Sequence, residues 1–211
     1  MPARPTPKPT ESSTEEKIKH AARSVFLSKG FAATRTRDIA EEAGINLALL
    51  NYYYRSKEKL FDLIMVETMR SFFQTIYEVF NRKETTLNKK IEILADKYID
   101  LLIANPDIPT FLMSEMRRNP AELMSKMGMG PVIMKSFFIE QFRQGVNEGK
   151  ITDMHPLHFI MNLMGMIVFP FISNPMLKAL GGISQKQFDA MMLERKKCIP
   201  KWIKTTLNTK L

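Results

Sequence analysis

The sequence predicts an all-α fold in which an N-terminal three-helix domain is joined to a larger helical domain, with about nine helices. Apolar residues recur at intervals of three and four over most of the chain, and glycines and prolines separate these stretches. No segment sustains the alternation of apolar and polar residues that a β-strand needs. Of the 211 residues, 45% are hydrophobic and 25% are charged, which is typical of a globular protein.

The charge of the chain indicates a polyanionic partner. The formal net charge is +9 and the pI is about 9.6. Residues 1–60 contain 11 Lys or Arg against 7 Asp or Glu, so positive charge is denser at the N-terminus. Because Lys and Arg gain affinity for phosphates by releasing counterions, we expect phosphate contacts in this part of the chain.

Cysteine usage and hydropathy predict a cytoplasmic protein. Cys198 is the only cysteine, so no intrachain disulfide can form. No apolar run of the kind found in secretory signals follows Met1. The apolar run Leu157 to Ile172 is short for a membrane span and contains Pro170, so we expect a buried helix there.

The first elements are an extended arm and a helix. Residues 1–11 contain four prolines and predict a flexible arm, either a plain disordered tail or a segment that follows a nucleic-acid groove. A helix is expected to open at Ser12 or Ser13, where Ser13 and Glu16 have the spacing of a capping box, and to stop at Gly30. Its buried face is predicted to consist of Ile18, Ala21, Ala22, Val25 and Phe26.

Two short helices joined by a glycine turn form the most specific local motif. Residues 34–43 predict one helix, and Asn46 is a suitable N-cap for another that ends at Tyr54. Gly44 supplies the positive φ of a tight turn between them, and Ile45 is expected to pack under that turn. This spacing predicts a helix-turn-helix.

Seven more helices are expected after Ser56, and the first is a long helix that Ser56 caps, with Glu58 in its first turn. Glycine or proline separates most of them, for example Asn105-Pro106, Gly128 to Pro131 and Gly181-Gly182. Beyond the long helix, which runs toward Phe80, the expected ranges are 87–104, 107–118, 120–127, 132–148, 154–173 and 184–207.

Residues 13–61 resemble the TetR/AcrR family of transcriptional regulators. The resemblance rests on Gly30-Phe31, Thr34, Asp38-Ile39-Ala40, Ala43-Gly44-Ile45, Leu50, Tyr53 and Ser56-Lys57-Glu58. It implies a helix-turn-helix DNA-binding domain over residues 12–60 and a helical domain for effector binding and dimerisation over residues 61–211. It also implies a regulator, most simply a repressor that a small effector releases from an inverted-repeat operator.

Four residues are expected to contact bases. The resemblance places Arg37, near the start of the second helix, at a base edge or phosphate, and an arginine there can pair with guanine O6 and N7. Leu47, Ala48 and Asn51 are expected on the exposed face of the third helix. Leu47 and Ala48 can touch thymine methyl groups, and Asn51 can pair with adenine N6 and N7.

Four residues are expected to contact phosphates: Thr36, Tyr52, Tyr53 and Lys57. Three successive tyrosines cannot all face one core, and we expect Tyr54 to pack inward. The sequence departs from the family pattern at Arg35, Thr36, Leu49 and Asn51, so the operator sequence does not carry over.

The C-terminal domain is rich in methionine, and two interpretations remain open. Fifteen of the sixteen Met residues follow residue 60, and flexible thioethers suit either a pocket for a small apolar ligand or a core without a ligand. The family resemblance favours the pocket. The residues that carry this hypothesis are Met113, Met116, Met124, Met127, Met161, Met164 and Met166.

A homodimer through helices 154–173 and 184–207 is also expected, because both helices present broad apolar faces and the family commonly pairs at this end. The apolar residues that suggest it are Ile160, Leu163, Ile167, Phe188, Met192, Ile199 and Trp202.

Other functions have weaker support. His155 and His158 lie near Asp153 but lack the context of a metal motif, and Cys198 is expected to be a buried thiol rather than an oxidant sensor. No nucleophile, base and orienting group cluster in the sequence, so we expect neither an enzyme nor a cofactor. A DNA-binding protein of the same fold without an effector remains the main alternative.

Overall fold

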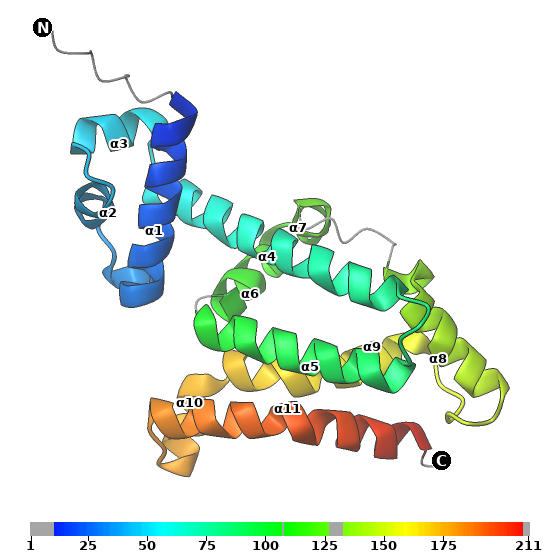
Figure 1. Ribbon diagram of the computed structural model, residues 1–211. Helices are drawn as coiled ribbons and strands as arrows, with labels where there is room; N and C mark the ends of the chain where they lie inside the picture. Colours follow the sequence, from blue (N-terminus) through cyan, green and yellow to red (C-terminus); the bar gives the residue numbers. More distant parts are fainter. Residues whose placement is uncertain (1–10, 107, 127–132, 209–211) are drawn as a thin grey trace, which may run out of the picture. The chain divides into compact units, whose positions relative to one another are not determined.

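The computed structural model describes residues 11–106, 108–126 and 133–208, and within these ranges every regular element is helical (Figure 1). These residues form eleven α-helices and one 3-10 turn, which confirms the all-α prediction. The chain divides into two compact units, Met1–Glu67 and Thr68–Leu211. The division follows Glu67, whereas the sequence placed the domain boundary after residue 60.

The first unit contains α1 (Glu11–Ala33), α2 (Thr36–Glu42), α3 (Leu47–Tyr53) and the beginning of α4 (Lys57–Asn81). Gly30, at φ 75° and ψ 162°, interrupts the helical backbone of α1 at the predicted stop. A non-glycine residue reaches this conformation only with strain, so the glycine is what lets the chain turn here. Gly44 takes φ 65° in the turn between α2 and α3, as predicted.

The core of this unit forms where one face of α1 packs against the other helices. Phe61 lies between two phenylalanines of α1, with its ring centroid 5.1 Å from Phe26 and 4.6 Å from Phe31. Each fully buried apolar side chain stabilises the fold by roughly 1.5–3 kcal/mol. All five residues of the predicted α1 face are buried, and the core comprises Ile18, Ala21, Ala22, Val25, Phe26, Ile39, Ala40, Leu50, Leu60, Phe61 and Ile64.

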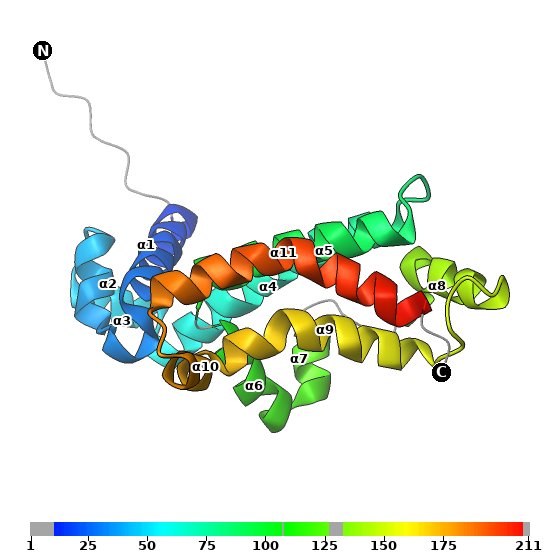
Figure 2. The same cartoon turned by 90° about the horizontal axis from the view of Figure 1, so that it is seen from below.

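The second unit contains the rest of α4 and seven further α-helices. In it α5, α9 and α11 lie side by side, and α10 joins α9 to α11 (Figures 1 and 2). The elements are α5 (Leu87–Ala104), α6 (Ile108–Arg118), α7 (Pro120–Lys126), the 3-10 turn η1 (Ile133–Lys135), α8 (Phe137–Asn147), α9 (Pro156–Ile172), α10 (Asn174–Gly181) and α11 (Gln185–Asn208).

Stacked aromatic rings form contacts between α4, α8 and α9 in the second unit. Phe138 of α8 stacks on Phe80 of α4 with ring centroids 4.2 Å apart. Phe142 of α8 stacks on Phe159 of α9 at 4.7 Å, so α8 links the end of α4 to the start of α9. Offset aromatic pairs contribute about 0.5–1.5 kcal/mol beyond the area that they bury.

α10 was not predicted from the sequence. In the sequence, Asn174-Pro175 resembles the end of one helix, and Gly181-Gly182 precedes the next predicted helix. Pro175 instead lies in the first turn of α10, where its missing N–H is not needed. Gly182 then ends the helix in the left-handed conformation at φ 58°.

The predicted helix over residues 132–148 is shorter than expected, because its described part is divided at Ser136 into η1 and α8. Met127, the break from Gly128 to Pro131 and the arm up to residue 10 lie outside the described residues. Across the described ranges, no single helix has the length and hydropathy needed to cross a bilayer. α9 and α10 pass that test only as a pair bent by 72°.

Candidate nucleic-acid interface and body cavity

The start of α3 is fixed by residues at and just before its first turn. Asn46 caps the helix, because its Oδ1 accepts a hydrogen bond from the backbone N–H of Leu49 at 2.8 Å. The turn before it is closed by a hydrogen bond from Ile45 N–H to the carbonyl of Ala40 at 3.0 Å. The predicted helix-turn-helix is thus present, with a buried α2 face and a capped α3.

One face of α3 is buried and the opposite face is open to solvent. Leu50 is only 1% exposed and anchors the helix in the core. Ala48, Asn51 and Tyr52 are exposed and lie on the other side of the helix. Tyr52 is 73% exposed, the largest value among the exposed large hydrophobic residues of this unit. A bulky aromatic side chain held in water on a rigid helix is expected at a contact surface.

Two predicted contacts of α3 lie at the edges of this outward face. Leu47 is half-buried, because it falls between the outward face and the side that carries Leu50. Tyr53 is also half-buried, and its ring meets that of Tyr52 edge to face at 5.4 Å. Leu49, which the sequence analysis did not count as a contact, is 36% exposed. Arg55, which follows α3, is exposed and was also missed.

The start of α2 presents positive charge. Arg35 and Arg37 are exposed, whereas Thr36 between them is half-buried. Asp38 accepts a hydrogen bond from the backbone N–H of Arg35 at 2.9 Å and pairs with Lys29 at 3.3 Å. These contacts lower the pKa of the Asp38 carboxyl, with the Arg35 hydrogen bond as the main cause. Asp38 thereby holds the backbone from which the two arginines project.

Lys57 has a structural role that its position in the sequence does not reveal. Its Nζ donates to the carbonyls of Phe31 and Thr34, both at 2.9 Å, and lies 4.2 Å from the centroid of the Phe31 ring. Two of the three ammonium N–H groups therefore bind the end of α1 and the segment that follows it. At most one N–H group is left for a phosphate.

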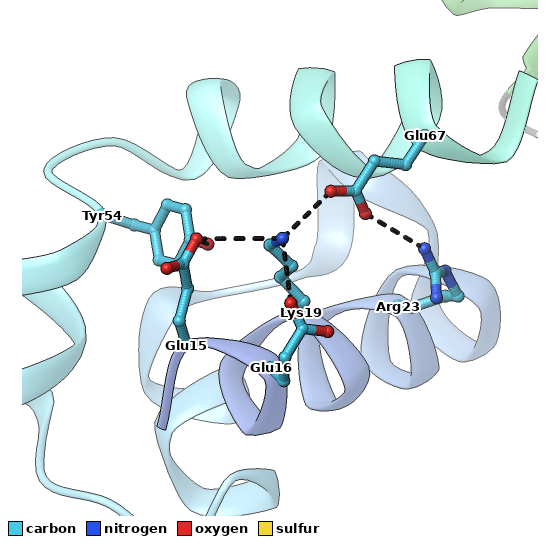
Figure 3. A network of polar contacts seen from close by, with 6 residues as sticks. All are labelled: Glu15, Glu16, Lys19, Arg23, Tyr54 and Glu67. Carbon is cyan, nitrogen blue, oxygen red and sulfur yellow. Dashed lines mark hydrogen bonds and ion pairs between the residues drawn. The ribbon is translucent and has the colours of Figure 1, made fainter. Parts of the chain in front are cut away.

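Tyr54 packs inward, as predicted, and joins a polar network on α1. Its hydroxyl donates to Glu15 Oε1 at 3.1 Å. Lys19 Nζ lies 3.8 Å from Glu15, 3.2 Å from Glu16 and 3.0 Å from Glu67 (Figure 3). The network connects the end of α3 to α1 and to the first part of α4.

The charges of this network are partly withdrawn from water. The Lys19 side chain is 15% exposed, and its hydrogen bond to Glu67 raises the pKa of its ammonium group. Arg23 adds a second cation at 3.5 Å from Glu67. Burial is the main cause of the raised pKa of Tyr54, and the charge of Glu15 adds to it. Tyr54 is therefore a neutral hydrogen-bond donor throughout the physiological pH range.

The second unit contains a cavity of about 760 Å³. Its size falls in the range of ligand pockets, and most of its walls are apolar. Met116, Met124 and Met164 line it, so three of the methionines that suggested a pocket are found there. The described residues that line it are Arg70, Phe73, Gln74, Ile76, Tyr77, Phe80, Leu94, Tyr98, Met116, Pro120, Leu123, Met124, Ile133, Ser136, Ile160, Leu163, Met164 and Val168.

The apolar residues that suggested a dimer interface are mostly core residues. Leu163, Ile167, Phe188, Met192 and Ile199 are buried within the chain, because α9 and α11 pack on each other and α11 packs on α5. Ile160 lines the cavity, and only Trp202 of that set is a large exposed residue. A different set remains exposed on α9, α10 and α11: Leu157, Met161, Phe169, Ile172, Met176, Leu180, Met191, Leu193 and Trp202.

The residues that raised the question of a metal or redox site have other surroundings. His155 caps α9, because its Nδ1 accepts a hydrogen bond from Leu157 N–H at 3.2 Å. Among the described residues, no group of three or more His, Cys, Asp or Glu side chains could hold a metal ion. Cys198 is partly exposed rather than buried.

Comparison with known proteins agrees with this architecture. The family described as "Bacterial regulatory proteins, tetR family" matches residues 18–64. The "Probable HTH-type transcriptional regulator YttP" of Bacillus subtilis is 25% identical over 165 residues, which cover 76% of this chain and 78% of that protein.

Solved structures share the fold over nearly the whole chain. A TetR/AcrR-family regulator from Thermobifida fusca has a TM-score of 0.64 at 16% identity, covering 90% of this chain and 97% of that one. FadR of Bacillus subtilis in complex with stearoyl-CoA has a TM-score of 0.58 at 16% identity, covering 92% and 99%. The match of residues 18–64 to the family and the relative that covers 76% of this chain identify a transcriptional regulator with a TetR-family DNA-binding domain, and the solved structures share its fold.

Proposed function

We propose that this regulator binds an inverted-repeat operator as a homodimer. We further propose that a small apolar effector, bound in the cavity of the second unit, releases the protein from the DNA. The outward face of α3 carries the proposal. Ala48, Asn51 and Tyr52 stand in water on a helix whose other side is locked into the core by Leu50. An α-helix presented in this way fits the major groove, where each base pair shows a distinct pattern of donors and acceptors.

Base recognition is assigned to Arg37, Leu47, Ala48 and Asn51. Asn51 is central, because it lies on the exposed face and its amide can pair with adenine N6 and N7. Ala48 faces thymine methyl groups, and Leu47 reaches them from the edge of the face. Arg37, exposed at the start of α2, pairs with guanine or with a phosphate next to it.

Phosphate contacts are assigned to Thr36, Tyr52, Tyr53 and Lys57. The exposed Tyr52 supplies a hydroxyl donor, and Tyr53 supports its ring from the side. Lys57 contributes its remaining N–H and the positive first turn of α4 while it holds the carbonyls of Phe31 and Thr34. Such contacts set the position of the protein on the duplex without reading sequence.

Dimerisation is assigned to α9 and α11, with the exposed rather than the buried apolar residues as the contact. Leu157 and Met161 lie one turn apart on α9, and Met191 and Trp202 share a face of α11. A second copy that covers this surface would form a two-fold interface and place two α3 helices on successive turns of DNA, about 34 Å apart.

The effector site is assigned to the cavity of about 760 Å³ in the second unit. The FadR structure of the same fold contains stearoyl-CoA, which supports a ligand with a long apolar part. An effector lowers DNA affinity only if it binds more tightly to a conformation that fits the operator poorly. Because α4 forms part of the cavity wall and begins next to the helix-turn-helix, it is the element through which the effector would act.

Selection of duplexes from a random DNA pool tests the DNA-binding part of the proposal. The full chain should enrich an inverted repeat, with affinity that falls as salt rises. Asn51→Ala should lose discrimination of about 1–3 kcal/mol at one base pair of each half-site. Asn88→Ala, at an exposed asparagine of α5, is the matched control and should leave the enriched sequence unchanged. An unaltered preference of the Asn51 variant would remove α3 from base recognition.

A further inference from the structure

Two of the described residues that line the cavity are both polar and buried. They are Tyr98, which is 2% exposed, and Ser136, which is 3% exposed. The Ser136 hydroxyl already donates to a backbone carbonyl of η1 at 2.6 Å. The other polar residues of the described lining, Arg70, Gln74 and Tyr77, are exposed. Tyr98 is therefore the buried lining residue whose hydroxyl proton is still available to a ligand.

Tyr98 faces the cavity from α5. Leu94 and Tyr98 lie four residues apart on one stripe of this helix, and both line the cavity. The Tyr98 ring meets two rings of α4, with centroid distances of 4.7 Å to Phe72 and 6.4 Å to Phe73. These contacts hold the ring, so that its hydroxyl is presented at one place on the cavity wall.

The Tyr98 hydroxyl lacks a hydrogen-bond partner within the described part of the chain, and burial is the cause of its raised pKa. Its oxygen is not enclosed by protein atoms, since it borders the cavity. The raised pKa keeps the hydroxyl protonated at physiological pH, so it remains a donor. Because buried tyrosine hydroxyls usually have a partner, this free donor points to a ligand that supplies the acceptor.

We propose that the cavity binds a neutral, mostly apolar molecule whose hydrogen-bond acceptor, such as a carbonyl oxygen, pairs with the hydroxyl of Tyr98. This assignment rests on the proposed function of the cavity as the effector site and names the chemical class of the effector. A ligand without an acceptor covers the hydroxyl and leaves it unpaired, which lowers its affinity. A site that presents a buried hydrogen-bonding group thereby rejects an analogue without the matching group.

The interior favours a neutral acceptor over an anion. Arg70 is the charged residue of the described lining, but it is exposed and already has an interaction within the protein. Lys90 precedes Tyr98 on α5 and is not one of the described lining residues. Its Nζ already donates to the carbonyl of Phe80 at 2.8 Å and to the amide oxygen of Gln141 at 2.9 Å. A carboxylate at the Tyr98 hydroxyl would lose its hydration for one neutral donor, which is unfavourable.

Equilibrium dialysis of the full chain tests the assignment with two rigid skeletons, each in three forms. The ketones are fluorenone and androstan-17-one, the hydrocarbons are fluorene and androstane, and the carboxylates are fluorene-9-carboxylate and androstane-17-carboxylate, all below their solubility limits. On the skeleton that binds more tightly, the ketone should bind about tenfold more tightly than the hydrocarbon and more tightly than the carboxylate. Hydrocarbons that bind as tightly as the ketones on both skeletons would overturn the assignment.

Tyr98→Phe removes only the hydroxyl and tests its role directly. The ketone should lose its advantage over the hydrocarbon, while the hydrocarbon binds within about twofold of its affinity for the wild type. Tyr77→Phe is the matched control, because Tyr77 lines the same cavity but is 50% exposed, so that water can satisfy its hydroxyl. This control should keep the preference for the ketone. A preference that survives in Tyr98→Phe would contradict the proposed hydrogen bond.

Two further measurements distinguish a ligand contact from a structural role of Tyr98. The infrared C=O stretch of bound fluorenone should lie at lower wavenumber in the wild type than in Tyr98→Phe, because a hydrogen bond weakens the carbonyl bond. Without ligand, Tyr98→Phe should leave the midpoint of urea unfolding unchanged or raise it, because no hydrogen bond to the described residues is lost. A lowered midpoint would reveal a protein partner of the hydroxyl and would count against the assignment.

The outcomes also separate this assignment from the proposed function. If a carboxylate binds at least as tightly as its ketone, the cavity remains an effector site but the assigned class is wrong. If none of the six compounds binds, the assigned class is wrong and the DNA-binding part of the proposed function is unaffected. If the ketones bind as expected but leave the affinity for selected DNA unchanged, the class stands and release by an effector is contradicted.

Discussion

Asp38 shows how one side chain can order the start of a DNA-binding element. Its carboxylate accepts from the backbone of Arg35 and pairs with Lys29, and both contacts favour the ionised form. A carboxyl whose pKa is lowered by folding stabilises the fold above its unfolded pKa, and this contribution is lost as pH falls through the folded pKa.

We therefore expect Asp38→Asn to lower the midpoint of urea unfolding at pH 7. The difference from the wild type should shrink as pH falls through the lowered pKa of Asp38, because the wild-type carboxyl is then protonated as well. Urea titrations of both proteins between neutral and acidic pH measure this difference. A gap that stays constant over that range would show that the charge of Asp38 is not what stabilises α2.

Features set by neighbouring residues could be predicted from the sequence. The Asn46 cap and the positive φ of Gly44 depend on contacts within four residues, so residue type and spacing suffice to identify them. The contacts of Lys57 could not be predicted in this way, because Phe31 and Thr34 lie 26 and 23 residues away. Periodicity placed Leu47 on the exposed face, but it lies at the edge of that face and is half-buried.

Between elements, the Glu67 carboxylate is the point at which α1 holds α4. It pairs with Lys19 at 3.0 Å and Arg23 at 3.5 Å, and it is the last residue of the first unit (Figure 3). Because the Glu67 side chain is 35% exposed, water screens part of the attraction.

Glu67→Gln should destabilise the first unit by roughly 0.5–1 kcal/mol. A double-mutant cycle with Lys19→Met, measured by chemical denaturation, should give a coupling energy above about 0.5 kcal/mol, because the two side chains are in contact. Lys17→Met, at an exposed lysine of α1, provides the control cycle, which should be additive. Additive effects of Lys19 and Glu67 would mean that the pair does not hold α1 to α4.

Lys90 performs a comparable function where α4 ends and α5 begins. Lys90→Ala should cost about 2–5 kcal/mol, because it leaves a cavity and removes the donor to the buried Phe80 carbonyl. Lys89→Ala removes an exposed lysine one residue earlier and should change stability by less than about 0.5 kcal/mol. Thermal and urea unfolding compare the two variants. Equal effects would contradict a specific role for the buried ammonium.

The helices were mostly predictable because their apolar stripes repeat over many turns. α5, α9 and α11 were identified with ends within two residues of those observed. α10 was not predicted, because a proline near its start and glycines at its end looked like breaks on either side of a loop. The same residues can flank a loop or a short helix, and the contacts of α10 with α9 and α11 are not visible in the local sequence pattern.

For the whole molecule, the exposed apolar faces of α9 and α11 that carry Leu157, Met161, Met191 and Trp202 set the expected assembly. Trp202→Glu should shift the protein toward monomers in sedimentation velocity and weaken binding to an inverted repeat, because it places a charge in the proposed interface. Leu193→Glu is the matched control, since Leu193 has similar exposure but lies on the opposite side of α11. A Trp202 variant that stays dimeric with full DNA affinity would place the interface elsewhere.

The helical architecture of the whole molecule could be predicted from the sequence, but the residues that form its cavity could not. The helix-turn-helix is a local pattern, and its residues lie where periodicity placed them, with Leu47 and Tyr53 shifted to the edges. The cavity is formed by side chains from α4, α5, α6, α7, η1 and α9, whose meeting depends on long-range packing. Methionine content indicated that such a site was possible, but of the six singled-out methionines that the structure describes, three line it.

Trp202 is the only tryptophan of the chain, it is 44% exposed, and the Arg195 guanidinium lies 5.0 Å from its ring. The chain therefore carries its own fluorophore on the surface assigned to pairing. When a second copy covers the indole, its emission should move to shorter wavelength, so self-association can be followed by dilution without a label. Since Trp202 does not line the cavity, its fluorescence reports on dimerisation rather than on direct contact with a bound effector.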